Sequence, residues 1–410
     1  MQPFRGTYDL LPSLFAEHKA VIDAACRTAG LYGFQQIDTP IFEYAGVFLH
    51  TLGETSDVVT KEMFTLMDRH GDLLALRPEG TAGVMRAVLS NNLYQGNPLK
   101  FFYSGPMFRY ERPQKGRTRQ FHQIGVETIG DANPCADVET IMLGWQILKT
   151  LGLEQSVQLE LNTLGDEESR NLYREALVKY FQKHEKELSL ESQIRLQKNP
   201  LRILDSKDPQ DQEFVGEAPK MKKFLTSDSL KFFEAVQEGL EKINVPYHLN
   251  DRLVRGLDYY CHTAFEFTTT LLGSQNAVLA GGRYNGLSQK LGGPSLPSVG
   301  WAAGIERLAM LAEQAIAVVR PISLIPLGDV AQEQAFKMLF DLRSKQMAVD
   351  LAWEGSLKSR MKRANRLNAK WAFIFGDDEL KQNTVTVKDL DSGDQTTVPL
   401  ENVESFIKAS

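Results

Sequence analysis

The most constraining feature of this sequence is a cluster of basic residues between two apolar stretches. Strand-like sequence covers residues 100–109 and 120–128, and the loop between them is charged and contains glycine. Five basic residues fall within eleven positions: Arg109, Arg112, Lys115, Arg117 and Arg119. Arg109 belongs to the first predicted strand, where a solvated hairpin tip needs no charge, and a buried guanidinium requires an anionic partner. We therefore predict a strand–loop–strand that binds an anion, with an ordinary solvated hairpin as the alternative.

The patterns on either side predict an α+β fold with a mostly antiparallel sheet. Further strands are predicted at residues 36–40, 63–66, 73–76, 157–162, 247–250, 264–269, 277–280 and 298–304. Helices are predicted from Pro12 to about residue 30, and at residues 80–93, 136–151 and 304–317. Residues from about 165 to 241 are helical and charged, with few β-branched side chains, which indicates a helical insertion into the sheet domain.

The pattern changes after Pro321, where strand, helix, strand, helix and strand follow one another. This order is typical of a small α/β domain with a largely parallel sheet. A chain of 410 residues is too long for one ordinary core. We therefore expect a domain at residues 1–320, which contains the insertion, and a second domain at residues 321–410.

Composition limits the compartment and the partners. No stretch approaches the roughly 20 apolar residues of a membrane span, and the N-terminus lacks the apolar core of a signal peptide. The three cysteines are far apart in sequence, which argues against disulfides or a zinc knuckle and favours a cytoplasmic protein. A net charge of −6 argues against non-specific nucleic-acid binding but leaves room for local basic patches.

The sequence lacks the glycine-rich phosphate loop G-x-x-x-x-G-K-[ST] and the dinucleotide-binding pattern G-x-G-x-x-G after a strand. If the protein uses ATP, side chains must hold the phosphates. Arginine suits this task because its planar guanidinium binds phosphate oxygens in pairs and remains charged.

Three segments together resemble the class II aminoacyl-tRNA synthetases. Phe108-Arg109-x-Glu111, the basic loop and Arg119-x-Phe121 are similar to motif 2 of that class, which holds ATP and the acceptor end of tRNA. Residues 36–40 resemble motif 1, whose proline lies at a dimer interface, and Gly304-Ile-Glu-Arg-Leu308 resembles motif 3. The resemblance implies an antiparallel class II catalytic core and a homodimer.

Two further segments resemble the signature sequences of histidyl-tRNA synthetases: Leu253-Val-Arg-Gly-Leu-Asp-Tyr-Tyr260 and Ala280-Gly-Gly-Arg-Tyr-Asn-Gly286. Leu76-Arg-Pro-Glu-Gly-Thr81 supports this resemblance, which extends over the whole chain and makes the last domain similar to an anticodon-binding domain. It implies that L-histidine is joined to tRNA(His) through histidyl-adenylate. ATP is then a substrate, accompanied by Mg²⁺, and no permanently bound cofactor and no protein-bound metal are expected.

The resemblance also implies roles for individual residues. Glu127 and Tyr260 would contact the histidine ring, with Tyr259 and Tyr284 in the same pocket, and Glu79, Thr81 and Gln123 would hold the α-ammonium group. For Glu127 the alternative is an outward-facing side chain, but Gln123 and Glu127 share strand parity and should project on one face. Arg109 and Arg255 would act at the α-phosphate and Arg307 at the γ-phosphate, as the catalytic residues. Glu111 would contact adenine, ribose or the tRNA end.

Two basic regions are candidates for tRNA binding. The loop candidates are Arg112, Gln114, Lys115 and Arg117. In a predicted helix at residues 355–367, Lys358, Lys362 and Arg366 form a basic stripe, while Leu357, Met361 and Ala364 should face the core. The alternative for this stripe is a solvated surface without RNA contact.

Two other functions share this fold. The first is a non-catalytic, histidine-binding regulatory subunit of ATP phosphoribosyltransferase, which typically lacks the last domain and some of the arginines. Arg109, Arg255 and Arg307 are all present here, as is the last domain. The second is an RNA-binding module without aminoacylation activity, and no kinase motifs accompany the domain to support it.

Overall fold

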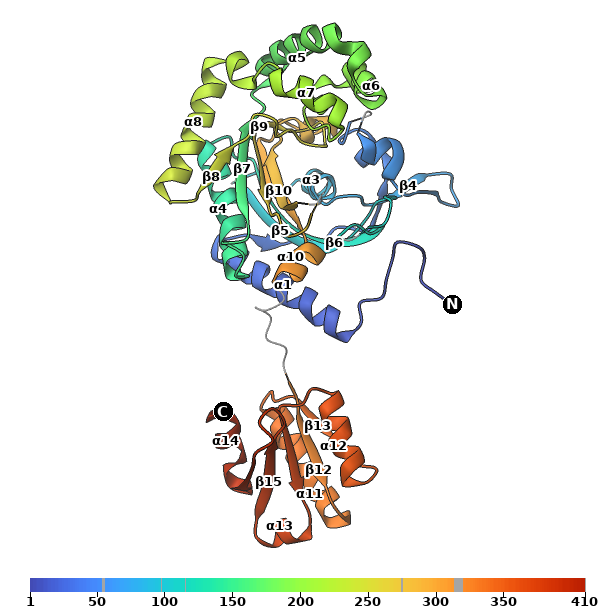
Figure 1. Cartoon of the computed structure of the whole chain (residues 1–410), viewed down its shortest axis with the longest axis vertical. Helices are drawn as coiled ribbons and strands as arrows, with labels where there is room; N and C mark the ends of the chain where they lie inside the picture. Colours follow the sequence, from blue (N-terminus) through green and yellow to red (C-terminus); the bar gives the residue numbers. More distant parts are fainter. Residues whose placement is uncertain (54–55, 97, 115, 274–275, 313–319, 410) are drawn as a thin grey trace. The chain divides into compact units, whose positions relative to one another are not determined.

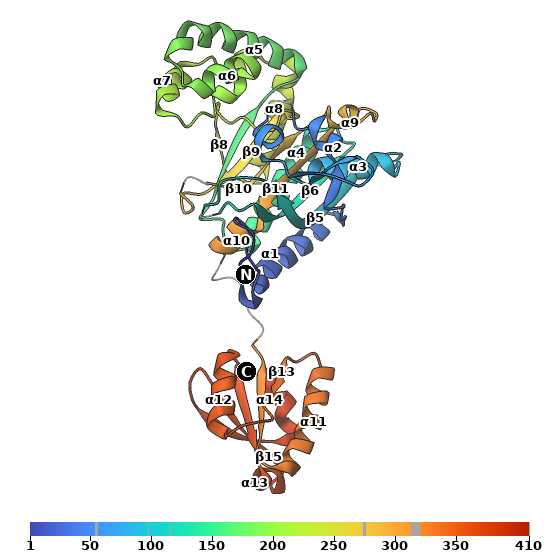
Figure 2. The same cartoon turned by 90° about the vertical axis from the view of Figure 1, so that its right-hand side faces the viewer.

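Figures 1 and 2 show the computed structural model, which describes residues 1–53, 56–96, 98–114, 116–273, 276–312 and 320–409. The chain divides into two compact units, Met1–Ile316 and Ala317–Ser410. Among the described residues, no helix is long and apolar enough to cross a membrane.

An eight-stranded sheet forms the centre of the first unit, in the order β1-β5-β6-β11-β10-β9-β7-β8. The strands are β1 Gln35–Gln36, β5 Leu99–Phe108, β6 Gln120–Ile129, β7 Gln158–Thr163, β8 Tyr247–Leu249, β9 Cys261–Thr268, β10 Ala277–Arg283 and β11 Ser298–Gly304. Only the outer pairs β1–β5 and β7–β8 are parallel. The prediction of an α+β fold with a mostly antiparallel sheet is therefore confirmed, and β5 and β6 form the predicted strand–loop–strand.

The strand predicted at residues 36–40 is wrong over most of its length. β1 ends at Gln36. Beyond it, the carbonyl oxygen of Thr39 accepts a hydrogen bond from the Arg77 guanidinium at 2.7 Å instead of from a neighbouring strand. Pro40 also has no N–H to offer a neighbouring strand. The chain then enters a small sheet, β2-β4-β3, made of β2 Phe42–Tyr44, β3 Thr65–Met67 and β4 Leu73–Leu76.

Helices cover both faces of the large sheet. One apolar cluster joins the sheet to α1 Pro12–Leu31, α4 Pro134–Thr150, α8 Ser227–Lys242 and α10 Ile305–Leu311. A second cluster contains α3 Thr81–Ser90, α2 Ala45–Leu49 and α9 Leu287–Lys290. Pro12 at the start of α1, and Asn133 with Pro134 at the start of α4, are favoured helix-initiating residues.

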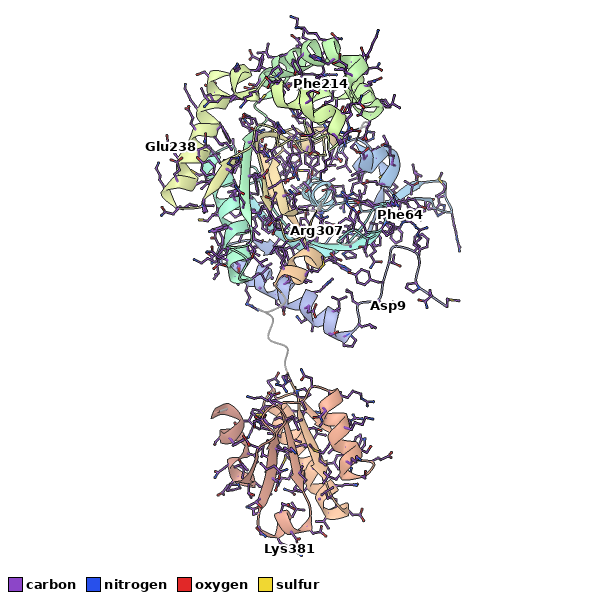
Figure 3. The ribbon with its side chains drawn as sticks, viewed as in Figure 1. Asp9, Phe64, Phe214, Glu238, Arg307 and Lys381 are labelled. Atoms are coloured by element: carbon purple, nitrogen blue, oxygen red, sulfur yellow. The ribbon has the colours of Figure 1, made fainter. Side chains whose placement is uncertain are left out.

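The helices of residues 165–241 fall into two groups. α5 Glu167–Phe181, α6 Leu190–Lys198 and α7 Pro209–Glu217 gather at one end of the unit, where Figure 3 labels Phe214 (Figures 1 and 3). α8 instead packs beside α4, and its Phe233, Val236 and Leu240 belong to the sheet's own apolar cluster. Asp166 joins the groups, because its carboxylate caps α5 at Ser169 and accepts the Thr226 hydroxyl at the start of α8.

The second unit has a five-stranded sheet in the order β13-β12-β14-β15-β16. Its strands are β12 Ile322–Pro326, β13 Val349–Leu351, β14 Trp371–Phe375, β15 Thr384–Asp389 and β16 Gln395–Pro399, and the first three are parallel. α11 Asp329–Ser344 and α12 Leu357–Arg366 cover opposite faces, and two short helices follow, α13 Asp377–Lys381 and α14 Val403–Ala409 (Figure 2). The predicted α/β character is confirmed.

The core-facing side of α12 differs from the prediction. Leu357 is exposed, whereas Arg360 is buried. The Arg360 guanidinium donates to the carbonyl oxygens of Gly355 and Trp353, at 2.8 and 2.9 Å, and to that of Pro326. The backbone carbonyl oxygens need a hydrogen-bond donor with a long side chain, so Arg360 is buried against them and Leu357 is not. Ala364 is buried and Met361 half-buried, as predicted.

Candidate active site

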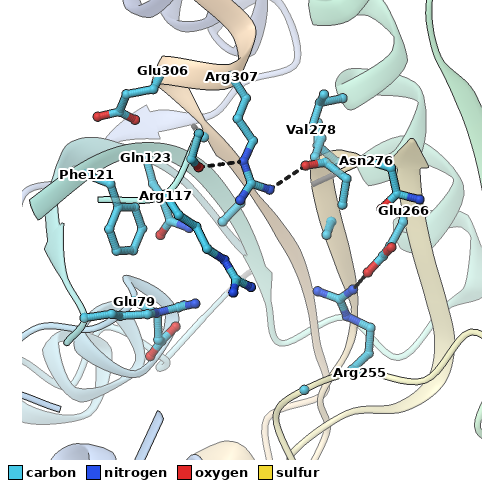
Figure 4. A pocket seen from close by; sticks show the side chains of 18 of the residues that line it. Glu79, Arg117, Phe121, Gln123, Arg255, Glu266, Asn276, Val278, Glu306 and Arg307 are labelled. Atoms are coloured by element: carbon cyan, nitrogen blue, oxygen red, sulfur yellow. Dashed lines mark hydrogen bonds and ion pairs between the residues drawn. The ribbon is translucent and has the colours of Figure 1, made fainter. Parts of the chain in front are cut away.

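A cavity of about 940 Å³ opens in the first unit between the sheet, the basic loop and the helical segment. Eleven predicted residues line it: Glu79, Thr81, Arg109, Glu111, Gln114, Arg117, Gln123, Arg255, Tyr259, Tyr260 and Arg307. Figure 4 shows Arg117, Arg255 and Arg307 reaching into it from different segments of the chain. Glu127 and Tyr284 are buried behind the lining residue Thr81.

The remaining predicted residues lie elsewhere. Arg112 is described but is not part of the cavity lining. Lys115 lies outside the described residues. Lys358, Lys362 and Arg366 are exposed on α12 of the second unit.

Glu127 is the centre of a buried hydrogen-bond network. Its carboxylate accepts from the hydroxyls of Thr81 at 2.7 Å, Tyr103 at 3.5 Å and Tyr284. Burial raises the pKa of Glu127 from 4.5 to about 8, although these hydroxyls oppose the shift. Of these residues only Thr81 lines the cavity, so its hydroxyl connects the buried Glu127 carboxylate to the space that a ligand would enter.

Two glycines make room for this network. A Cβ atom at Gly300 would collide with the Glu127 carboxylate, and one at Gly125 would collide with the Tyr103 ring. Tyr103 lies directly opposite Gly125 in the β5–β6 register, so the tyrosine occupies space that any other residue at position 125 would fill. The sequence prediction missed Tyr103, and its only signal was a glycine opposite an aromatic residue.

Glu79, Thr81 and Gln123 all line the cavity, and Thr81 connects them to Glu127. Glu79 accepts from the backbone N–H groups of Thr81 and Ala82, at 2.7 and 2.9 Å, at the start of α3. Burial raises the pKa of Glu79, and these N–H groups oppose the shift. Among the described residues, the buried Gln123 Oε1 has no hydrogen-bond partner. An incoming ammonium group would find both a carboxylate and a free acceptor here.

Aromatic rings form the neighbouring wall. The centroids of Tyr259 and Tyr260 are 4.5 Å apart, and that of Tyr284 lies 5.6 Å from Tyr259. All three side chains are buried. A flat ring that enters the cavity could therefore pack against aromatic faces while its edge meets the Glu127 network.

Arg109 and Arg307 are both held by hydrogen bonds to backbone carbonyl oxygens. Arg109 Nε donates to the Pro78 carbonyl oxygen at 2.9 Å, and the guanidinium carbon lies 5.4 Å from the centroid of the Phe121 ring. Arg307 donates to the carbonyl oxygens of Ala277 and Gly116, at 2.7 and 3.3 Å (Figure 4). Burial, and next the nearby Arg117, lower the pKa of Arg307. A bound anion would relieve this unfavourable burial of positive charge.

Arg255 forms an ion pair with Glu266 on the wall formed by β9 (Figure 4). Its guanidinium carbon lies 5.2 Å from the centroid of the Tyr260 ring. The sequence prediction missed Glu266, which is the charged residue between Phe265 and Phe267 in an apolar strand. A single charged residue in an otherwise apolar strand was the sequence signal that could have identified Glu266.

One group of side chains has the composition of a metal site. Ligand atoms of His18, His122 and Glu306 lie within 4.8 Å of one another. Glu306 already accepts hydrogen bonds from the backbone N–H and from the ring of His122, both at 2.9 Å. These bonds join β6 to the start of α10, so the geometry is sufficient for a structural role.

Comparisons with known proteins identify the family. The family described as histidyl-tRNA synthetase matches residues 6–308, and the family described as anticodon binding domain matches residues 322–410. Proteins named Histidine--tRNA ligase from Rhodospirillum rubrum and Gluconacetobacter diazotrophicus are 53% and 50% identical. Each match covers 99% of this chain and 98% of the relative.

A solved structure agrees with the sequence matches. The apo histidyl-tRNA synthetase of S. aureus superposes with a TM-score of 0.80 at 34% identity and covers 99% of both chains. The chain therefore belongs to the histidyl-tRNA synthetase family.

Proposed function

We propose that the cavity of the first unit is the site at which histidine is activated. The chain is a histidine–tRNA ligase, a class II aminoacyl-tRNA synthetase. It is similar to relatives of that name over nearly their whole length. It forms histidyl-adenylate from histidine and ATP, releases pyrophosphate, and then transfers histidine to the terminal ribose of tRNA. The observation that supports this site best is the buried Glu127 network beside three arginines that enter one cavity.

Histidine selection rests on hydrogen-bond acceptors at fixed positions. The imidazole ring donates one N–H when neutral and two when protonated. Glu127 and Tyr260 contact its edge, Tyr259 and Tyr284 pack around it, and a wrong side chain leaves these buried groups unpaired. Sites of this kind discriminate by about 10⁴-fold or more. Glu79, Thr81 and Gln123 hold the α-ammonium group.

Activation is an in-line attack of the histidine carboxylate on the α-phosphorus of ATP. The protein supplies positioning and charge stabilisation rather than covalent chemistry. Arg109 and Arg255 bind the α-phosphate, where negative charge develops, and Arg307 binds the γ-phosphate. Glu111, held at 2.7 Å by Arg117, faces the adenine, the ribose or the tRNA end. ATP enters as its Mg²⁺ complex, with the metal as part of the substrate.

Two surfaces contact tRNA in this proposal. Gln114 and Arg117 of the basic loop line the cavity and meet the acceptor end, together with Arg112 and Lys115. Lys358, Lys362 and Arg366 of α12 contact RNA phosphates in the anticodon-binding unit. Their exposure supports this role, because solvated cations keep their charge available to a polyanion.

The protein acts as a homodimer in this proposal. Phe42, Tyr44 and Leu66 project from one face of the small sheet, and all three are exposed. Apolar side chains gathered on one face typically mark a protein–protein contact. Light scattering of the purified protein should give twice the chain mass of 46.1 kDa, and a mass of one chain would contradict the dimer.

The decisive experiment is exchange of labelled pyrophosphate into ATP with each of the twenty amino acids. Exchange should occur with histidine alone, and aminoacylation of tRNA should follow. If histidine binds without exchange, the regulatory-subunit alternative replaces the proposal. If another amino acid supports exchange equally well, the roles assigned to the Glu127 network are wrong.

A further inference from the structure

We propose that Glu266 is a positioning residue that holds Arg255 in the orientation needed at the α-phosphate. This inference rests on the role proposed for Arg255 in activation. Glu266 would touch neither substrate and would act only through the arginine.

The carboxylate of Glu266 comes from a rigid element. β9 lies between β10 and β7, and Glu266 is in register with Ala280 on one side and Glu160 on the other. Phe265 and Phe267 are fully buried in the opposite direction, where they belong to the core beneath the sheet. Because side chains alternate along a strand, this packing directs Glu266 to the cavity.

Arg255 has much weaker support from its own backbone. It lies in a segment between β8 and β9 that forms neither helix nor strand. Its guanidinium lies between the Tyr260 ring and Glu266, and among the described residues the buried Nε has no hydrogen-bond partner. The ion pair therefore restrains a long side chain while leaving donors for a ligand.

Other carboxylates make this restraint necessary. Asp205, from the helical segment, and Glu160, from β7, also line the cavity and act electrostatically on Glu266. Glu160 is engaged by Asn250 at 2.6 Å. Without the negative charge of Glu266, Arg255 would be drawn toward these groups and away from its working position. Small misplacements of a catalytic group can lower rates by about 100-fold.

The test compares Glu266→Gln with wild type in histidine-dependent pyrophosphate exchange. The amide keeps the shape but not the charge, so kcat should fall by about 10- to 100-fold while KM for ATP changes less than about threefold. Glu266→Asp keeps the charge at shorter reach and should recover part of kcat. Glu139→Gln is the matched control, since it removes a carboxylate from a partly buried ion pair with Lys100 and should leave kcat unchanged.

A double-mutant cycle separates positioning from a general structural role. In an Arg255→Ala background, Glu266→Gln should cause no further loss, because its target is missing. Additive losses, or a kcat for Glu266→Gln within about twofold of wild type, would overturn the inference. Normal exchange by Arg255→Ala would instead refute the proposed role of Arg255 and the inference with it. If Glu266→Gln does not fold, the double-mutant cycle is measured with Glu266→Asp instead, and additive losses with Arg255→Ala overturn the inference.

Discussion

Arg283 pairs with Asp137, and Arg255 pairs with Glu266, within the same unit of this protein. Both partners of the first pair are completely buried, with 0% exposure. In the second pair, the side chains are 14% and 21% exposed at the cavity wall. The same two chemical groups therefore occur once in the interior and once at the wall of the cavity proposed as the active site.

The pairs differ most in the hydrogen bonds that remain to the arginine. Arg283 also donates to the backbone carbonyl oxygens of Asp131 and Asn133, at 2.8 and 3.3 Å, and to the Asn285 side chain. It thereby ties β10 to the loop that starts α4. Arg255 has an unpartnered buried Nε among the described residues. A buried arginine with satisfied donors stabilises the fold, and one with spare donors at a cavity is available to a ligand.

The second unit repeats this contrast on a single helix. Arg360 of α12 is buried and donates to three backbone carbonyl oxygens. Lys358, Lys362 and Arg366 of the same helix are exposed to solvent. We expect the first residue to matter for stability and the other three for RNA affinity.

The largest expected effect is that of Asp137→Asn on stability. The substitution leaves the buried Arg283 charge without its anion, which should lower the free energy of unfolding by about 3–5 kcal/mol. Urea denaturation of wild type and variant measures this difference. A loss below about 1 kcal/mol would show that the backbone carbonyls alone are enough for Arg283.

Arg255→Ala should show the opposite pattern. If Arg255 donates to the α-phosphate as proposed, its loss should lower kcat for pyrophosphate exchange by about 100- to 1000-fold. Stability should change much less than for Asp137→Asn, because Arg255 is partly open to the cavity. The same urea experiment gives the comparison, and a loss of activity that only follows a loss of folded protein would remove the distinction between the two pairs.

Glu127→Gln tests a buried carboxylate that has no cationic partner in its hydrogen-bond network. The pKa of Glu127 is raised from 4.5 to about 8, so between these values the folded protein keeps a proton that the unfolded chain releases. Wild type should therefore lose stability as pH rises from 5 to 8, by up to about 1.4 kcal/mol per pH unit from this group. Glutamine does not titrate. The free energy of unfolding, measured without histidine, should therefore rise for the variant relative to wild type as the pH increases. A constant difference across this range would contradict the raised pKa.

The smallest effect is expected for the triple substitution of Lys358, Lys362 and Arg366 by alanine. If each contacts a phosphate, the logarithmic salt dependence of tRNA binding should become less steep by about 2 to 3. Pyrophosphate exchange, which requires no tRNA, should remain unchanged and serves as the control. An unaltered salt dependence would instead support the alternative, in which the basic stripe is a solvated surface without RNA contact.

Local patterns in the sequence predicted most elements, because their signals lie in neighbouring residues. Pro12 begins α1, β4 and β11 have the predicted bounds, and the basic loop joins β5 to β6 as expected. The predictions were wrong where a distant group decides. Arg77 takes the carbonyl oxygen that would have extended β1, and three carbonyls place Arg360 where Leu357 was expected.

The sequence by itself determined the family and the residue types at the proposed site, since its motifs contain the arginines, glutamates and tyrosines to which the proposal gives roles. Only the tertiary structure showed that Glu127 is buried in a hydroxyl network, that Tyr103 fills the space opposite Gly125, and that Glu266 forms an ion pair with Arg255. These contacts join residues far apart in the chain. Their energies depend on burial and on the distance between groups, and neither quantity exists until the sheet has formed.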